Sequence, residues 1–204
     1  MLSFNLKNGV TSSSNPQAVG YISFGFDNIG DALFPLGFNL FDKYGYLGEP
    51  SITPVQPYNL NKVLGFYKDG QAETYFGIAY DHLNPSPNHY QVQPQPFPNF
   101  GLYFHPSHTP AKKNLIARFK IPFDGVATTI SKVQRATFGC GSNIGYTVKN
   151  GLVDLTARTI ISPTDGIVTL SNTGTFLAGD EIDFIVDSGN DGADSCDDTA
   201  VDIT

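Results

Sequence analysis

The stretch Leu115-Ile-Ala-Arg-Phe-Lys-Ile121 decides the fold, because its apolar residues recur at every second position. Successive side chains of a β-strand point to opposite faces of a sheet, so such alternation predicts a strand with one face in a core. Arg118 and Lys120 fall on the other face. The face toward the core would carry Leu115, Ala117, Phe119 and Ile121.

The same period of two recurs along the chain, whereas no segment sustains the helical period of 3.6 residues. Two clear cases are residues 144–148 and 182–186. The Asn150-Gly151 turn, which tolerates positive φ, predicts a hairpin leading into residues 152–161. Further candidate strands cover residues 19–26, 34–41, 75–80, 100–104, 126–130, 166–170 and 200–203.

Composition agrees with an all-β protein. The 204 residues are 40% hydrophobic and 13% aromatic, but only 15% charged against a usual level of about 25%. The 21 glycines and 14 prolines make the chain rich in turns. These values argue against a coiled coil, a collagen-like rod and a disordered tail. Some ten short strands separated by turn signals indicate an all-β sandwich or barrel.

The chain divides into two parts that differ in composition and in the regularity of their strands, although we expect one domain over residues 1–204. Residues 1–110 carry most of the prolines and aromatic residues, with long irregular loops between strands. Residues 111–204 contain regular strands and an acidic C-terminal loop. Neither part looks able to close its own sheets, which favours a single sandwich.

Charge is distributed unevenly. The net charge is −7, and no Lys or Arg follows Arg158, so the last 46 residues carry −10. This acidic end would repel nucleic acid and anionic lipid. No apolar run approaches the roughly 18 residues that a membrane span needs, so we expect no membrane insertion. The N-terminus also lacks the pattern of a signal peptide.

The sequence resembles a jelly-roll module of bacterial secreted and surface proteins. The resemblance begins at Leu102-Tyr-Phe-His-Pro106 and Ile116-Ala-Arg-Phe-Lys-Ile-Pro-Phe-Asp-Gly125. It continues at Tyr146-Thr-Val-Lys-Asn-Gly151, at residues 178–186 and in the closing segment 197–203. The usual Arg-Trp step is Arg118-Phe119 here. With this resemblance we expect an antiparallel β-sandwich of the jelly-roll type. The resemblance implies a sandwich of the carbohydrate-binding kind, located outside the cell or on its surface, and carries over no functional residues.

The sequence contains none of the common catalytic signatures. A Gly-x-Ser-x-Gly elbow, a phosphate-binding glycine loop and a His-Glu-x-x-His pair are all absent. No pair of carboxylates stands out as a glycosidase pair. We therefore expect a protein that is not an enzyme.

Aromatic residues supply the candidate ligand site. Sugar rings stack their apolar faces on exposed aromatic rings, while polar side chains bind the hydroxyls. Suitable residues lie in or beside the proline-rich loops, although the absence of tryptophan weakens this interpretation. The candidates are Tyr75, Tyr80, His89, Tyr90, Tyr103 and His105.

The acidic loop 187–198 supplies a candidate Ca²⁺ site. Ca²⁺ prefers six to eight oxygen ligands, and a flexible Asp, Asn and Gly loop provides them. The ligands would be Asp191, Asp194, Asp197 and Asp198, in a segment without a nearby basic residue. The alternative is a solvated acidic loop that binds no ion.

The two cysteines, Cys140 and Cys196, lie in Gly, Asp and Ser-rich stretches. They either form a disulfide, which would place the protein outside a reducing cytosol, or remain unrelated thiols.

Two functions remain open from the sequence. The first is a non-catalytic extracellular binding module for carbohydrate. The alternative is a structural subunit of an extracellular filament, sheath or phage particle, assembled from copies of itself through β-strand exchange.

Overall fold

The computed structural model is built almost entirely of strands. It describes residues 3–6, 9, 14–17, 20–28, 38–41, 43–47, 63–67, 77–81, 102–105, 113–135, 143–189 and 199–204. Within these ranges fourteen strands form two antiparallel sheets of seven strands each. No α-helix occurs among these residues, and no helix in the described chain is long and apolar enough to cross a membrane.

The first sheet has the order β10-β9-β13-β7-β1-β2, and β11 pairs with β9 beside this path. Its central strand, β7, contains nearly all of the alternating stretch at residues 115–121 that predicted the fold. The strands are β1 (Ile22–Asn28), β2 (Asn39–Leu40), β7 (Lys113–Lys120), β9 (Ile144–Asn150), β10 (Val153–Asp154), β11 (Thr159–Ile161) and β13 (Glu181–Asp187).

The second sheet has the order β12-β8-β14-β6-β5-β4-β3. Its strands are β3 (Lys43–Leu47), β4 (Val63–Tyr67), β5 (Gly77–Asp81), β6 (Leu102–His105), β8 (Gly125–Arg135), β12 (Val168–Phe176) and β14 (Thr199–Ile203). Each sheet therefore combines strands from residues 1–110 with strands from residues 111–204.

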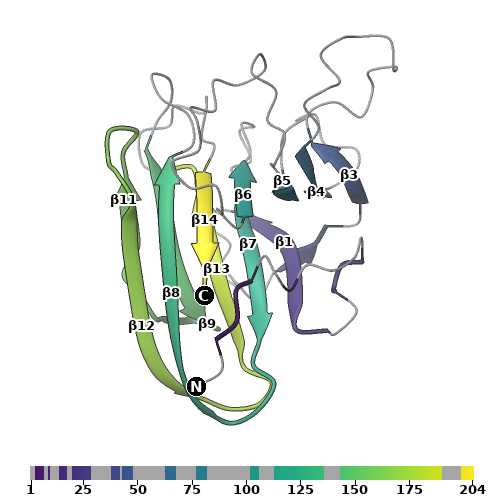
Figure 1. Ribbon diagram of the computed structural model, residues 1–204, viewed down its shortest axis with the longest axis vertical. Helices are drawn as coiled ribbons and strands as arrows, with labels where there is room; N and C mark the ends of the chain where they lie inside the picture. The colour runs from purple at the N-terminus through teal and green to yellow at the C-terminus, as the bar shows by residue number, and fades with distance from the viewer. Residues whose placement is uncertain are drawn as a thin grey trace.

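The connectivity confirms the predicted jelly-roll sandwich. From β7 onward the long strands alternate between the sheets, with β7, β9 and β13 in the first and β8, β12 and β14 in the second. Figure 1 shows the two layers, with β12, β8 and β14 in front of β9, β13 and β7. Alternation of this kind wraps two sheets around one shared core.

The core lies between the inner faces of the two sheets. In β7, Leu115 and Ala117 are fully buried in it, as the period of two predicts. The second sheet contributes Leu102 and Phe104 from β6. Alternate residues of other strands complete the cluster, among them Ile22, Phe24, Ile144, Val148, Ile182, Phe184, Val201 and Ile203.

Strand positions match the sequence pattern best where the alternation is regular. The predicted hairpin after β9 exists, but its two-residue loop is Gly151-Leu152, with Gly151 at φ 57°, and Asn150 is the last strand residue. The segment 166–170 extends to Phe176 as β12, and segment 34–41 supplies only β2 within the described residues. The strands β3 and β4 were not predicted.

The N-terminal segment is tied to both sheets. The Asn15 side chain accepts a hydrogen bond from the Phe24 amide (2.9 Å) and donates to the carbonyls of Phe24 (2.7 Å) and Phe41 (2.8 Å). The Leu6 amide donates to the Ile203 carbonyl at the end of β14 (2.9 Å). Figure 1 shows both chain ends on the same side of the molecule.

A buried hydrogen bond crosses the core. The hydroxyl of Tyr146, in the first sheet, donates to the Ser131 hydroxyl in the second sheet at 2.9 Å. Tyr146 is fully buried, and this burial raises the pKa of its phenol well above the ordinary value, although the bond to Ser131 opposes the shift.

Because the folded chain keeps the Tyr146 proton above pH 10, where an unfolded tyrosine loses it, stability falls as pH rises. This single site contributes about 1.4 kcal/mol per pH unit above pH 10. Urea unfolding from pH 8 to pH 11 measures the loss, and Tyr146→Phe isolates it from other titrating groups. The variant is expected to lose stability less steeply; equal slopes for the two proteins would contradict this expectation.

Candidate functional site

The structure places three of the six candidate ligand residues on neighbouring strands. Tyr80 lies in β5, and Tyr103 and His105 lie in β6, which pairs with β5. The other candidates, Tyr75, His89 and Tyr90, lie outside the described residues. Tyr80 lies where the pairing of β4 with β5 shifts, between Ala79 opposite Gly65 and Asp81 opposite Leu64, so it has no register partner. Of the six candidates, only Tyr103 and His105 therefore share one strand and one face by register.

The strand register sets the neighbours of Tyr103. Leu102 and Phe104 belong to the core, so the pleat assigns positions 103 and 105 to the outer face of the second sheet. Small residues occupy the paired positions on both sides of Tyr103. The row across the sheet reads Gly45, Gly65, Ala79, Tyr103 and Ala200. Its last member, Ala200, is buried.

A second row runs parallel to the first, one pleat away. It reads Lys43, Tyr67, Gly77 and His105, on β3, β4, β5 and β6. Gly77 separates the positions of Tyr67 and His105, which lie two strands apart, or about 10 Å. We call the two rows together the β3–β6 strip.

Sequence reasoning missed Tyr67, Lys43 and the small residues of the β3–β6 strip. The signal that brings them together is strand pairing, because Gly65 and Ala79 lie far from Tyr103 in the sequence but beside it in register. Lys43 and Tyr67 belong to β3 and β4, the two strands that the alternation did not predict.

The four proposed Ca²⁺ ligands, Asp191, Asp194, Asp197 and Asp198, lie outside the described residues, so the metal site stays a prediction. Within the described ranges, no three His, Cys, Asp or Glu side chains gather as a metal site. Cys140 and Cys196 also lie outside those ranges, and their pairing stays a prediction.

One premise of the Ca²⁺ prediction was wrong. The sequence suggested that no basic residue lies near the acidic loop. Asp187, the first residue of that loop, pairs with Arg158, which lies between β10 and β11 in the sequence. Arg158 donates two hydrogen bonds to its carboxylate, at 2.6 and 2.8 Å. Gly145 makes room for this carboxylate, since a Cβ at that position would collide with it. The hydrogen bond and charge of Asp187 raise the pKa of Arg158 despite some burial.

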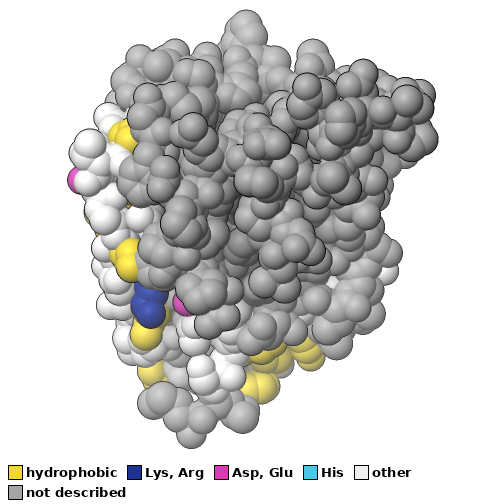
Figure 2. Space-filling model, turned by 45° about the horizontal axis from the view of Figure 1, so that its top comes forward, with side chains coloured by type: hydrophobic (Ala, Val, Ile, Leu, Met, Phe, Trp, Pro, Cys, Tyr) yellow, Lys and Arg dark blue, Asp and Glu magenta, His cyan; other side chains and the backbone are white. Residues whose placement is uncertain are grey.

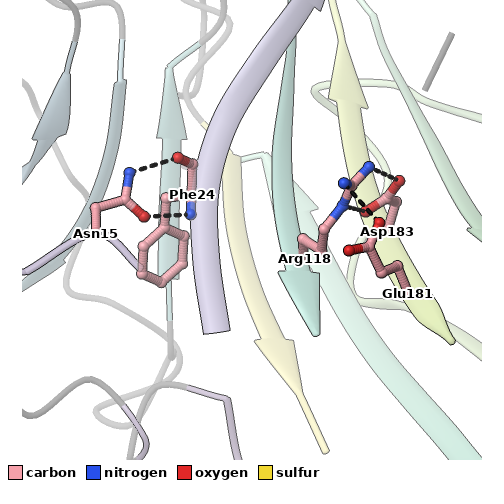
Figure 3. Close-up of polar contacts among 5 residues, drawn as sticks. All are labelled: Asn15, Phe24, Arg118, Glu181 and Asp183. Carbon is pink, nitrogen blue, oxygen red and sulfur yellow. Dashed lines mark hydrogen bonds and ion pairs between the residues drawn. The ribbon is translucent and has the colours of Figure 1, made fainter. Parts of the chain in front are cut away.

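A more deeply buried ion pair lies on the outer face of the first sheet (Figure 3). Arg118 of β7 donates from Nε and Nη2 to the carboxylate of Asp183 on β13, at 2.7 and 2.9 Å. Its Nη1 lies 2.7 Å from Glu181. The guanidinium also stacks 4.1 Å from the ring centre of Phe38, which packs over Gly25.

Burial and charge compete at this ion pair. Burial raises the pKa of Asp183, with a further contribution from Glu181, while the hydrogen bond and charge of Arg118 oppose the rise. Burial works against the Arg118 charge too, but Asp183 and Glu181 outweigh it and raise the pKa of Arg118. Since protein carboxylates already occupy three guanidinium nitrogens, we assign Arg118 to positioning β13 against β7 and not to ligand binding.

No protein-family model matches this sequence, and no curated protein matches it. Among solved structures, the isomalto-dextranase of Arthrobacter globiformis, determined with panose, is 13% identical with a TM-score of 0.33. The match covers 69% of this chain but only 22% of that enzyme.

Two smaller proteins also resemble the chain. The C-terminal CBM6 of a marine laminarinase from Zobellia galactanivorans is 17% identical over 50% of this chain and 90% of its own, with a TM-score of 0.25. The CBM22 xylan-binding domain of a Paenibacillus barcinonensis protein is 12% identical over 48% of this chain and 74% of its own, with a TM-score of 0.26. At these identities and TM-scores, the ligands named for those proteins cannot be assigned to this chain.

Proposed function

We propose that the chain is a non-catalytic carbohydrate-binding module whose ligand lies on the β3–β6 strip. The observation that supports this most is the register of Tyr103, which has Ala79 on one side and Ala200 on the other. On the β5 side, Ala79 and Gly65 carry little side-chain bulk beside this position, whereas Ala200 on the β14 side is buried. A sugar ring can then stack its apolar face there.

The second row supplies the polar half of such a site. Gly77 adds no side chain between the positions of Tyr67 and His105, which lie two strands apart in this row. Histidine offers a donor and an acceptor to sugar hydroxyls, and Lys43 offers a donor at the end of the row. An extracellular or cell-surface location belongs to the same proposal, since the sequence resemblance is to secreted and surface modules.

Affinity electrophoresis in gels containing soluble β-glucan, xylan or dextran tests the proposal. We expect at least one polysaccharide to retard the protein, and Tyr103→Ala to weaken the retardation at least tenfold, because the stacking surface is lost. Tyr21→Ala is the matched control, since Tyr21 is 41% exposed beside the first sheet. It should bind as the unmodified protein does.

Two results would overturn the proposal. Migration unaffected by all three polysaccharides would remove carbohydrate of these classes as the ligand. Retardation of Tyr103→Ala equal to that of the unmodified protein would place binding away from the β3–β6 strip. Circular dichroism of each variant shows that the sheets are retained.

A further inference from the structure

The strand β12 forms an edge of the second sheet. It pairs with β8 along its whole length, from Val168 opposite Val133 to Phe176 opposite Gly125. Among the described residues no strand pairs with its other edge. Figure 1 shows β12 along the left border of the molecule, the outermost strand of its layer.

This edge has none of the features that usually prevent strands from pairing. Exposed edges are commonly protected by Lys, Pro, bulges or short length. The sequence of β12, Val-Thr-Leu-Ser-Asn-Thr-Gly-Thr-Phe, has nine residues without a charge or a proline, and its pairing with β8 has no register shift. In Figure 2 the described surface along the left rim is mostly uncharged or hydrophobic.

The outer face of β12 carries a regular row of hydroxyls. Thr169, Ser171, Thr173 and Thr175 are exposed and alternate with partly buried residues. One such hydroxyl already pairs with the neighbouring strand β8, where the side-chain oxygens of Thr128 and Thr173 lie 2.8 Å apart. On the inner side, Asn172 donates to the Leu155 carbonyl of the first-sheet region at 2.6 Å.

We propose that β12 is the contact between two copies of this chain, which pair antiparallel about a two-fold axis through Asn172. In this register Ser171 faces Thr173 of the second copy, and Thr169 faces Thr175. Each exposed hydroxyl therefore meets another hydroxyl, and Leu170 meets Gly174 on the inner side. The interface is self-complementary, as a closed two-fold contact requires.

The absence of charge within β12 permits a second copy at this edge. Residues 159–204, which include β12, carry −10, so a contact between copies in this region needs a segment without carboxylates. The uncharged β12 lets two chains approach without opposing carboxylates within the paired strands. The two second sheets then continue as one sheet of fourteen described strands.

Sedimentation analysis over a wide range of protein concentration tests this contact. The unmodified protein should show a concentration-dependent dimer. Ser171→Lys combined with Thr173→Lys places like charges opposite each other across the axis, and should lower the association constant at least tenfold. Ser171→Lys combined with Thr173→Glu alters the same positions but places opposite charges together, and should retain the dimer.

Three results would overturn the β12 contact. The first is a protein that stays monomeric at the highest concentration. The second is a dimer unaffected by the double-lysine variant, because association then uses another surface. The third is equal loss of the dimer in both double variants, which contradicts the charge-paired register. The polysaccharide assay is independent of these results, since β12 lies at the opposite end of the sheet from β3, β4 and β5.

Discussion

Replacing Arg118 with alanine should lower the free energy of unfolding by about 3–5 kcal/mol, because it leaves a buried carboxylate without its partner. The Asp183 side chain is only 1% exposed, and Glu181 adds a second negative charge beside it. Urea denaturation at pH 7 measures the loss. Removing a buried ion-pair partner costs far more than the net stabilisation that the intact pair provides.

The loss of stability caused by Arg118→Ala should be larger at neutral pH than at acidic pH. Burial already raises the pKa of Asp183, and Arg118→Ala removes the interactions that oppose the rise. A carboxylate with a raised folded pKa destabilises the fold as pH rises through that pKa. The difference in the free energy of unfolding between Arg118→Ala and the unmodified protein should therefore be smaller at pH 4 than at pH 7.

Asp154→Ala is the matched control for Arg118→Ala. Asp154 pairs with Lys149 at 2.6 Å, but its side chain is 54% exposed, so water screens the pair. Its loss should cost less than about 1 kcal/mol. An equally small effect for Arg118→Ala would show that the pair on the outer face of the first sheet is solvated in solution.

Replacing Phe104 with alanine should lower the free energy of unfolding by about 3–5 kcal/mol, since it opens a cavity in the core. Phe104 is fully buried on β6, which joins β5 on one side and β14 on the other. The loss should appear as one shifted transition in urea if residues 1–204 form one domain. Phe123→Ala, at a position 63% exposed, should change stability by no more than about 0.5 kcal/mol.

Two separate transitions, only one of which moves in Phe104→Ala, would contradict the single-domain prediction. That result would mean that β3 to β6 unfold independently of β8, β12 and β14. Tryptophan is absent, so tyrosine fluorescence and far-ultraviolet circular dichroism are the two probes to compare.

The sequence predicted the fold wherever one face of a strand is apolar and the other polar. Residues 115–121, 144–148 and 182–186 show this alternation, and they became β7, β9 and β13. The strands β3 and β4 contain Gly45 and Gly65, so their pattern has no clean period. Glycine contributes no side chain to either face, which removes the signal that marks a strand.

The sequence could not predict which distant side chains meet. Arg118 and Asp183 are 65 residues apart, and their ion pair depends on β7 and β13 being neighbours. The same holds for Arg158 with Asp187, which overturned the premise of an acidic loop without a basic residue. For the candidate ligand site, composition suggested aromatic residues, but only the register placed Tyr103 among small neighbours.

The position of β14 has a consequence for synthesis on the ribosome. The strand ends at Ile203, yet it lies between β8 and β6 in the middle of the second sheet. A nascent chain therefore cannot join β12 and β8 to the strands from residues 1–110 until residues 199–203 have left the exit tunnel. Until then β6 and β8 each present an unpaired edge, so the second sheet is completed only after the rest of residues 1–204 has emerged.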